Sequence, residues 1–340
     1  MILMPSKRSI KTDQLHVLKI VSYSAFVLAV LALMSSLVIL YTLAPIAFKA
    51  SNQSSSAPQQ VNAGHTGTLA GIDNPLNGSS LSIINNAPNA YFEKAGEMYL
   101  NGTLSDPVFL SSAKITPFNL NDGKATVLYF GSITCVFCGE NRWAMALALS
   151  RFGSFSQLFT GYSSLGDGDL PTLYWNKVNY NGSSDSLGNY YSSSTLNFMS
   201  IEDTHPITGG FALNSMPQIK ANINAQNNTA YSAAFDYILN LSNNKTTAFQ
   251  GTPYTIWGNY LFSGADAEVF GNTTPSGSTL PLTYMTHGQV FAQLANPSDQ
   301  FAYGEYAAAD VYVAAICKSI NNTASVCSLP AINALEASYK

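Results

Sequence analysis

The segment from Gly123 to Gly153 constrains the fold of this chain more than any other part of the sequence. Residues 125–130 read ATVLYF, a short apolar run with a glycine on either side. Such a run, rich in β-branched and aromatic residues, is typical of a strand buried on both faces. A Cys-Val-Phe-Cys motif at 135–138 follows, and residues 139–153 have apolar side chains at helical spacing. The predicted order is buried strand, short loop, CxxC motif and helix.

The two cysteines of this motif, Cys135 and Cys138, are predicted to be a redox pair. A cysteine at a helix N-terminus faces unsatisfied N–H groups and the positive end of the helix dipole, which stabilise a thiolate. Such positions lower a thiol pKa from about 8.5 to about 3.5–7.5, and the thiolate is the attacking species in disulfide exchange. Cys135 is the expected nucleophile and Cys138 the resolving thiol. The alternatives are a permanent structural disulfide and half of a zinc site, although structural zinc usually needs two such pairs.

Four further residues near this pair are open to more than one interpretation. Arg142, one helical turn after Cys138, is either a cation that favours the thiolate or a solvated surface charge. Trp143 is expected in the core rather than on a substrate-binding surface. Glu140 and Glu202 are candidate proton acceptors for the resolving thiol.

A second element of interest lies far downstream, where Thr252-Pro253 precedes two short aromatic runs. Residues 254–257 and 260–262 are separated by Gly-Asn, which predicts a β-hairpin. The bond before a proline is the one peptide bond for which the cis form is accessible at low cost. A cis-proline facing the CxxC motif would leave the Thr252 backbone available to a substrate chain. The alternative is an ordinary trans proline at the start of a strand.

The remaining cysteines, Cys317 and Cys327, are ten residues apart and do not form a CxxC motif. Cys317 ends a long apolar helix predicted over about 300–319, and Cys327 follows a polar loop. A structural disulfide is the expected arrangement outside the cell, and a second redox pair is the alternative. The four histidines are isolated in the sequence, so we expect no metal site and no cofactor.

The N-terminal region predicts a membrane anchor. Residues 20–48 contain no charge over 29 positions, and a bilayer-spanning helix needs about 20 apolar residues. A cleaved signal peptide or a buried helix are the alternatives. Basic residues within 1–19 predict a cytoplasmic N-terminus, so the rest of the chain would be extracellular. Residues 49–90 are rich in Ser, Asn, Gly and Pro, which predicts a flexible linker.

The composition excludes several functional classes. Charged residues make up only 10% of the chain and the net charge is −4, which does not fit a protein that neutralises nucleic-acid phosphates. An aromatic content of 12% excludes disorder throughout. Nine Asn-x-Ser/Thr sequons fit an exported glycoprotein, although so much Asn, Ser and Thr also generates sequons by chance. They lie at Asn52, Asn77, Asn101, Asn181, Asn227, Asn240, Asn244, Asn272 and Asn321.

Four blocks of the sequence together resemble a known family. They are YFGSITCVFCGENRWAMALALSRFG (129–153), LNFMSIE (196–202), TPYTIWGNYLFSG (252–264) and AAICKSINNTASVC (314–327). The blocks are similar to a family of archaeal, membrane-anchored, thioredoxin-like proteins of undetermined function, domain of unknown function 929. The resemblance covers roughly 90–330 and is looser in the middle. It implies an α/β thioredoxin-like fold, thiol–disulfide exchange by Cys135 and Cys138, and Pro253 as the cis-proline. Val136-Phe137 replaces the Pro or His common between such cysteines, which leaves the direction of electron transfer open.

The resemblance also implies a domain layout. The 115 residues that separate Cys138 from Pro253 exceed what a minimal thioredoxin unit needs. We therefore expect a thioredoxin-like domain over 91–335 with an insertion at 154–245, which by analogy with similar extracytoplasmic oxidoreductases would form a cap beside the site.

The predicted function is that of a single-pass, membrane-anchored, extracytoplasmic thiol–disulfide oxidoreductase. Its expected partners are cysteine-containing exported or surface proteins and an unidentified redox partner, with no nucleic acid. The alternative is a non-catalytic, thioredoxin-like adhesion or assembly module with structural disulfides.

Overall fold

The computed structural model describes residues 73–104, 111–133, 135–163, 170–178, 185–204, 216–242, 253–263, 285–298 and 300–339. All of them belong to one compact unit that spans Asn62–Lys340. The anchor predicted at 20–48 lies outside these ranges. Within them, no helix combines the length and the apolar character that a membrane crossing requires.

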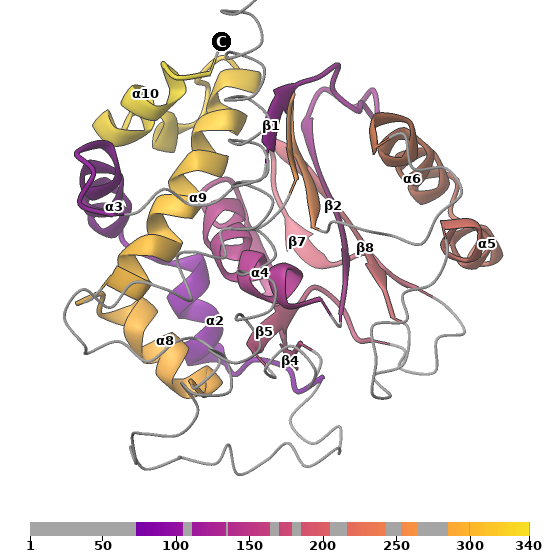
Figure 1. Cartoon of the computed structure of the whole chain (residues 1–340), viewed down its shortest axis with the longest axis horizontal. Coiled ribbons are helices and arrows are strands. Elements are labelled where there is room, and N and C mark those ends of the chain that lie inside the picture. Colours follow the sequence, from indigo (N-terminus) through magenta and orange to yellow (C-terminus); the bar gives the residue numbers. More distant parts are fainter. Residues whose placement is uncertain are drawn as a thin grey trace, which may run out of the picture. The chain divides into compact units, whose positions relative to one another are not determined.

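The described residues form a mixed α/β fold around a six-stranded sheet (Figure 1). Strands β2 and β8 run parallel, and every other neighbouring pair is antiparallel. In spatial order the strands are β1 (Ser111–Lys114), β10 (Tyr260–Ser263), β9 (Tyr254–Trp257), β2 (Ala125–Ser132), β8 (Leu196–Asp203) and β6 (Ser186–Leu187). Two smaller sheets pair β3 (Ser154–Gln157) with β7 (Tyr190–Ser192) and β4 (Phe159–Tyr162) with β5 (Pro171–Tyr174).

Helices cover both faces of the central sheet (Figure 1). One face carries the larger hydrophobic core, which takes side chains from α2 (Gly78–Asn85), α3 (Asn89–Leu100), α4 (Val136–Leu149), α8 (His287–Ala295), α9 (Gln300–Ser319) and α10 (Pro330–Glu336). The other face carries a smaller core under α5 (Met216–Ala225) and α6 (Thr229–Ser242).

Strand β2 contributes to both cores, as the continuous apolar run predicts. Val127 and Tyr129 face the larger core, and Leu128 and Phe130 face the smaller one. Since successive strand residues point to opposite faces, a central strand covered on both sides needs apolar residues at every position.

Helix α4 is buried on all sides. Every residue from Cys138 to Ser150 is buried, including the polar side chains of Glu140, Asn141 and Arg142. Trp143 is fully buried, and its indole Nε1 donates a hydrogen bond to the Pro171 carbonyl at 3.0 Å. The expectation that Trp143 belongs to the core is confirmed.

The predicted hairpin is formed by β9 and β10. Its turn requires glycine at position 258, where φ is +59° and a Cβ would collide with Ser319 at the end of α9. The Ser319 hydroxyl accepts a hydrogen bond from the Asn259 N–H at 2.9 Å. The predicted long helix over 300–319 is present as α9.

The linker predicted over 49–90 is wrong for the part that the structure describes. Helix α2 and the start of α3 lie within that range. The Asn77 side chain accepts a hydrogen bond from the Ser80 N–H and caps α2, and Ile84 is fully buried. These apolar contacts outweigh a composition that otherwise favours flexibility. The bounds of the insertion at 154–245 stay a prediction; β8, which lies inside them, is a strand of the central sheet.

Candidate functional site

The site is built around the first turn of α4. Cys135 is the N-cap residue of this helix, with an extended backbone (φ −81°, ψ 123°), and its sulfur accepts the Cys138 N–H at 3.4 Å. An N-cap side chain normally accepts one of the orphan N–H groups of the first turn, and here a sulfur does so. Cys135 is partly exposed, and both cysteines are present as thiols. The predicted position of Cys135 at the start of the helix is confirmed.

Cys138 lies beneath Cys135 and is fully buried. The backbone of Ser132 holds both cysteines. Its N–H donates to the Cys138 sulfur at 3.4 Å, and its carbonyl accepts the Cys135 N–H at 3.3 Å. Phe137, between the two cysteines, is 46% exposed, which is unusual for so large an apolar side chain here. The motif therefore offers solvent one thiol and one aromatic ring.

The strand register brings the hairpin to the same end of the sheet. Tyr254 at the start of β9 pairs with Phe130 near the end of β2, so Pro253 lies at the end of β2 that leads to Cys135. Pro253 is buried. Thr252 lies outside the described residues, so its predicted role and the cis form of the Thr252–Pro253 bond stay predictions.

Arg142 and Glu202 form an ion pair in the interior of the protein. Arg142 is fully buried and Glu202 is 2% exposed. The guanidinium donates to both carboxylate oxygens, from Nε at 2.9 Å and from Nη2 at 2.6 Å. Nη2 also donates to the Ser132 carbonyl at 3.0 Å. Arg142 is therefore a buried cation that contacts the residue holding both thiols, and the alternative of a solvated surface charge is wrong.

Two aromatic rings enclose the Arg142 guanidinium. Its central carbon lies 5.7 Å from the centre of the Tyr129 ring and 5.4 Å from that of Tyr174. Gly131 leaves room for the Tyr129 ring, which a Cβ at 131 would strike. Burial raises the pKa of Tyr129 well above its ordinary value, against the opposing charge of Arg142. Burial also raises the pKa of Glu202, and the Arg142 charge again opposes that rise.

The β4–β5 hairpin forms one wall of the site. The Thr172 hydroxyl donates to the Gly139 carbonyl at 2.6 Å, and a Cβ at 139 would lie 3.0 Å from Leu170 Cδ2. His287 fixes the hairpin to α8, because its Nε2 lies 2.8 Å from the Thr172 carbonyl oxygen and 2.9 Å from that of Gly161. These contacts give His287 a structural role. Across the ranges that the structure describes, no group of three or more His, Cys, Asp or Glu side chains could hold a metal ion.

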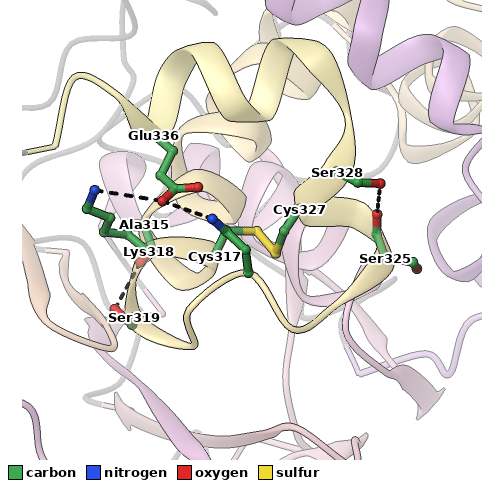
Figure 2. Close-up of a disulfide and its surroundings, with 9 residues drawn as sticks. Ala315, Cys317, Lys318, Ser319, Ser325, Cys327, Ser328 and Glu336 are labelled. Carbon is green, nitrogen blue, oxygen red and sulfur yellow. Dashed lines mark hydrogen bonds and ion pairs between the residues drawn. A yellow bond between two sulfur atoms is a disulfide. The ribbon is translucent and has the colours of Figure 1, made fainter.

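The second cysteine pair lies near the C-terminal end of α9 (Figure 2). Cys317 and Cys327 form a disulfide with a Cα–Cα distance of 5.4 Å, and both residues are buried. The bond joins the last turn of α9 to the 3₁₀ helix Ser325–Ser328. Glu336 of α10 lies alongside, 3.8 Å from the Lys318 ammonium. The predicted disulfide between Cys317 and Cys327 is confirmed.

The chain belongs to the family described as Domain of unknown function (DUF929), whose model matches residues 111–318. This range is more than half of the chain and includes both CxxC cysteines, the Arg142–Glu202 pair and Pro253. No curated protein and no solved structure matches the chain.

Sequence reasoning missed the pairing of Arg142 with Glu202. The two residues are 60 positions apart in the sequence. The parallel register of β2 with β8 brings them together, because it pairs Glu202 with Gly131, which lies shortly before the start of α4. The available signal was the presence of charged residues in two largely apolar elements, Glu140 and Arg142 in α4 and Glu202 and Asp203 in β8. Such residues are buried only when they are paired.

Proposed function

We propose that this chain is a thiol–disulfide oxidoreductase of thioredoxin-like fold, anchored in the cell membrane by residues 20–48, that acts on cysteine-containing exported or surface proteins. The observation that carries the proposal is the placement of Cys135. Its partly exposed sulfur caps the N-terminus of α4, where N–H groups and the helix dipole favour a thiolate.

The topology of the sheet supports a thioredoxin-like core. The four strands β10, β9, β2 and β8 lie side by side, with β2 parallel to β8 and antiparallel to β9. Helix α4 follows β2 directly, and α9 follows the hairpin and packs against the same face of the sheet as α4. A strand, a CxxC helix, a hairpin and a C-terminal helix are the elements that the resemblance implied.

The chemistry is an exchange of two electrons between two cysteine pairs. The Cys135 thiolate attacks one sulfur of a substrate disulfide, forms a mixed disulfide and releases the other substrate sulfur as a thiolate. The Cys138 thiolate then attacks the Cys135 sulfur and displaces the remaining substrate sulfur. The enzyme pair loses two electrons and the substrate pair gains them, and the released thiolates take up the protons. The reverse sequence oxidises a substrate dithiol.

The surroundings of Cys135 fit a protein substrate. Phe137 exposes an apolar ring beside the nucleophile, and Pro253 lies at the end of β2 from which the motif departs. An extended substrate segment could contact the ring and the backbone before Pro253 at the same time. Binding of an extended substrate segment next to a thiol pair requires an accessible, partly apolar surface of this kind.

Trapping of mixed disulfides tests the proposal. In a Cys138→Ser variant the Cys135 thiolate still attacks, but no thiol resolves the product, so disulfide-linked adducts with exported proteins should accumulate. Cys135→Ser is the matched control, because it leaves a buried thiol and should trap none. The absence of adducts with Cys138→Ser, together with no accessible thiol after mild reduction of the wild type, would overturn the proposal and favour a non-catalytic surface module.

A further inference from the structure

The Arg142–Glu202 pair lies where a charge would act on the buried thiol. Arg142 follows Cys138 by four residues on α4, and residues at this spacing share a helix face with Cβ atoms about 5–6 Å apart. The two residues also share the Ser132 backbone, whose N–H contacts the Cys138 sulfur and whose carbonyl accepts Arg142 Nη2. The cation is thus shielded from solvent on the helix face that carries Cys138, and its charge acts on the thiol without a direct hydrogen bond.

Stability alone does not account for this ion pair. Arg142 and Glu202 are both removed from water, and the desolvation cost of such a pair commonly equals or exceeds the attraction between its charges. An apolar pair of similar volume would fill the same space at least as well. At low dielectric, however, a fixed charge acts strongly on any neighbouring group that gains or loses charge.

We propose that the Arg142–Glu202 pair sets the reduction potential of the Cys135–Cys138 couple: Arg142 stabilises the Cys138 thiolate, and Glu202 limits that effect. The inference rests on the proposed function and adds a role for two residues that do not themselves exchange sulfur. Both are positioning residues, since they act through the thiols.

The sign of the effect follows from the redox states. Reduction of the enzyme disulfide takes up two electrons and yields two sulfurs that can carry negative charge, whereas the disulfide carries none. A buried cation therefore stabilises the reduced state and makes the couple more oxidising. A buried carboxylate does the opposite. Glu202 does not cancel Arg142 at Cys138, because the Ser132 contact is made by the guanidinium and not by the carboxylate.

Other titratable groups lie close to the ion pair. The further charged or ionisable side chains buried at this end of the packed elements include Glu140 on α4, Tyr129 on β2, Tyr174 on β5, Asp203 on β8 and Asp185, which directly precedes β6. Burial lowers the pKa of Arg142, but the negative charge of Glu202 raises it, with smaller contributions from Tyr129 and Cys138. The result is a pKa raised well above the ordinary value of arginine. Arg142 is therefore the persistent cation of this cluster.

Opposite substitutions test the inference by sign. In the full chain, Arg142→Gln should shift the redox equilibrium with glutathione at least tenfold toward the enzyme disulfide, a fall of about 30 mV in the reduction potential. Glu202→Gln keeps the side-chain shape and should shift the equilibrium in the opposite direction by a similar factor. Arg142→Lys keeps the charge and should restore most of the wild-type value. Arg151→Gln, near the far end of α4, is the matched control and should not change it.

A direct measurement of Cys138 separates this inference from the proposed function. In a Cys135→Ser background, Cys317 and Cys327 are held in the disulfide, so the ultraviolet absorbance of thiolate follows Cys138 alone. Arg142→Gln should raise the pKa of this thiol and Glu202→Gln should lower it. Shifts of the same sign, or none, would overturn the inference even if the enzyme exchanges disulfides. A wild-type pair that exchanges with no substrate would overturn the proposed function instead.

Discussion

Helices α4 and α9 are both buried almost completely, but they differ in the state of their cysteines and in the pairing of their buried charged residues. Helix α4 begins with a thiol at the surface, and α9 ends with a cysteine in a buried disulfide. The buried charged residues of α4 are Arg142, which is paired with Glu202, and Glu140. In α9, neither carboxylate oxygen of Asp310 has a hydrogen-bond partner among the described residues. The comparison shows that the two helix ends give their cysteines different environments: a partly exposed thiol at the N-cap of α4, and a buried disulfide in the last turn of α9.

The largest expected difference between the two helices is in disulfide exchange. Cys135→Ser should reduce exchange with a model dithiol to the uncatalysed background, because the attacking sulfur is gone. The double variant Cys317→Ala/Cys327→Ala should keep at least half of the wild-type rate, since neither residue contacts the first turn of α4. Rates measured with an exchange assay at fixed thiol concentration decide this. A loss of exchange in a folded double variant would mean that the second pair takes part in the reaction.

Removal of the α9 disulfide should instead reduce stability. The bond closes a loop of ten-residue separation, and chain-entropy arguments assign such a loop about 2–3 kcal/mol of unfolding free energy. The variant Cys317→Ala/Cys327→Ala should show this loss in urea unfolding, and Cys135→Ala, at a partly exposed position, should cost less. Equal losses in the two variants would contradict the distinction between the pairs.

The buried carboxyl of α9 should make stability depend on pH. Burial raises the pKa of Asp310 well above its ordinary value, with a further contribution from Glu93 and opposition from Arg151. Since the folded state then holds a proton that the unfolded state releases above about pH 4, the contribution of Asp310 to stability is greatest below that pH and falls as the pH rises toward its folded-state pKa. The slope is at most about 1.4 kcal/mol per pH unit.

Asp310→Asn should remove this dependence, because a neutral amide replaces the protonated acid. Unfolding free energies measured from about pH 4 to about pH 7 should fall less for the variant than for the wild type. Asp122→Asn is the control of opposite sign. The Asp122 pKa is lowered, first by the hydrogen bond from Asn197, so its contribution is lost as the pH falls. An unchanged profile for Asp310→Asn would show that the carboxyl is ionised in the folded protein.

The smallest effect is expected at Phe137, the exposed ring at the start of α4. Phe137→Ser should change the unfolding free energy by no more than about 0.5 kcal/mol, because the ring already contacts solvent. It should raise the KM for an unfolded protein substrate severalfold and leave exchange with a small disulfide unchanged. Equal effects on the two substrates would argue against a substrate-contacting role for the ring.

Much of the fold was predictable because its central elements carry strong local signals. The apolar run of β2, the helical spacing after Cys138 and the Gly258-Asn259 turn each specify one element without help from the rest of the chain. Helix α2 was missed because only Ile84 within it is buried, and five of its other seven residues are Gly, Ser or Asn. In that case packing against the larger core, rather than intrinsic propensity, selects the helix.

The candidate site was predictable only in part. The thiol positions follow from a motif of four adjacent residues, whereas the ion pair of Arg142 with Glu202, 60 positions away, depends on the register of β2 with β8. Periodicity does not reveal that Arg142 turns inward, since one basic residue in an apolar helix fits a surface position equally well. The partner strand decides the outcome, and its register is a property of the tertiary structure.

The ring of Tyr312 in α9 joins both halves of the proposed site. It stacks on Trp257 of β9 with ring centres 4.5 Å apart, and its hydroxyl donates to Asn141 of α4 at 2.6 Å. A rotation of α9 would therefore displace both the strand that follows Pro253 and the helix that contains Cys138. Tyr312 thus links the strand after Pro253 to the helix of the CxxC motif, and the Cys317–Cys327 disulfide anchors the C-terminal end of the same helix α9.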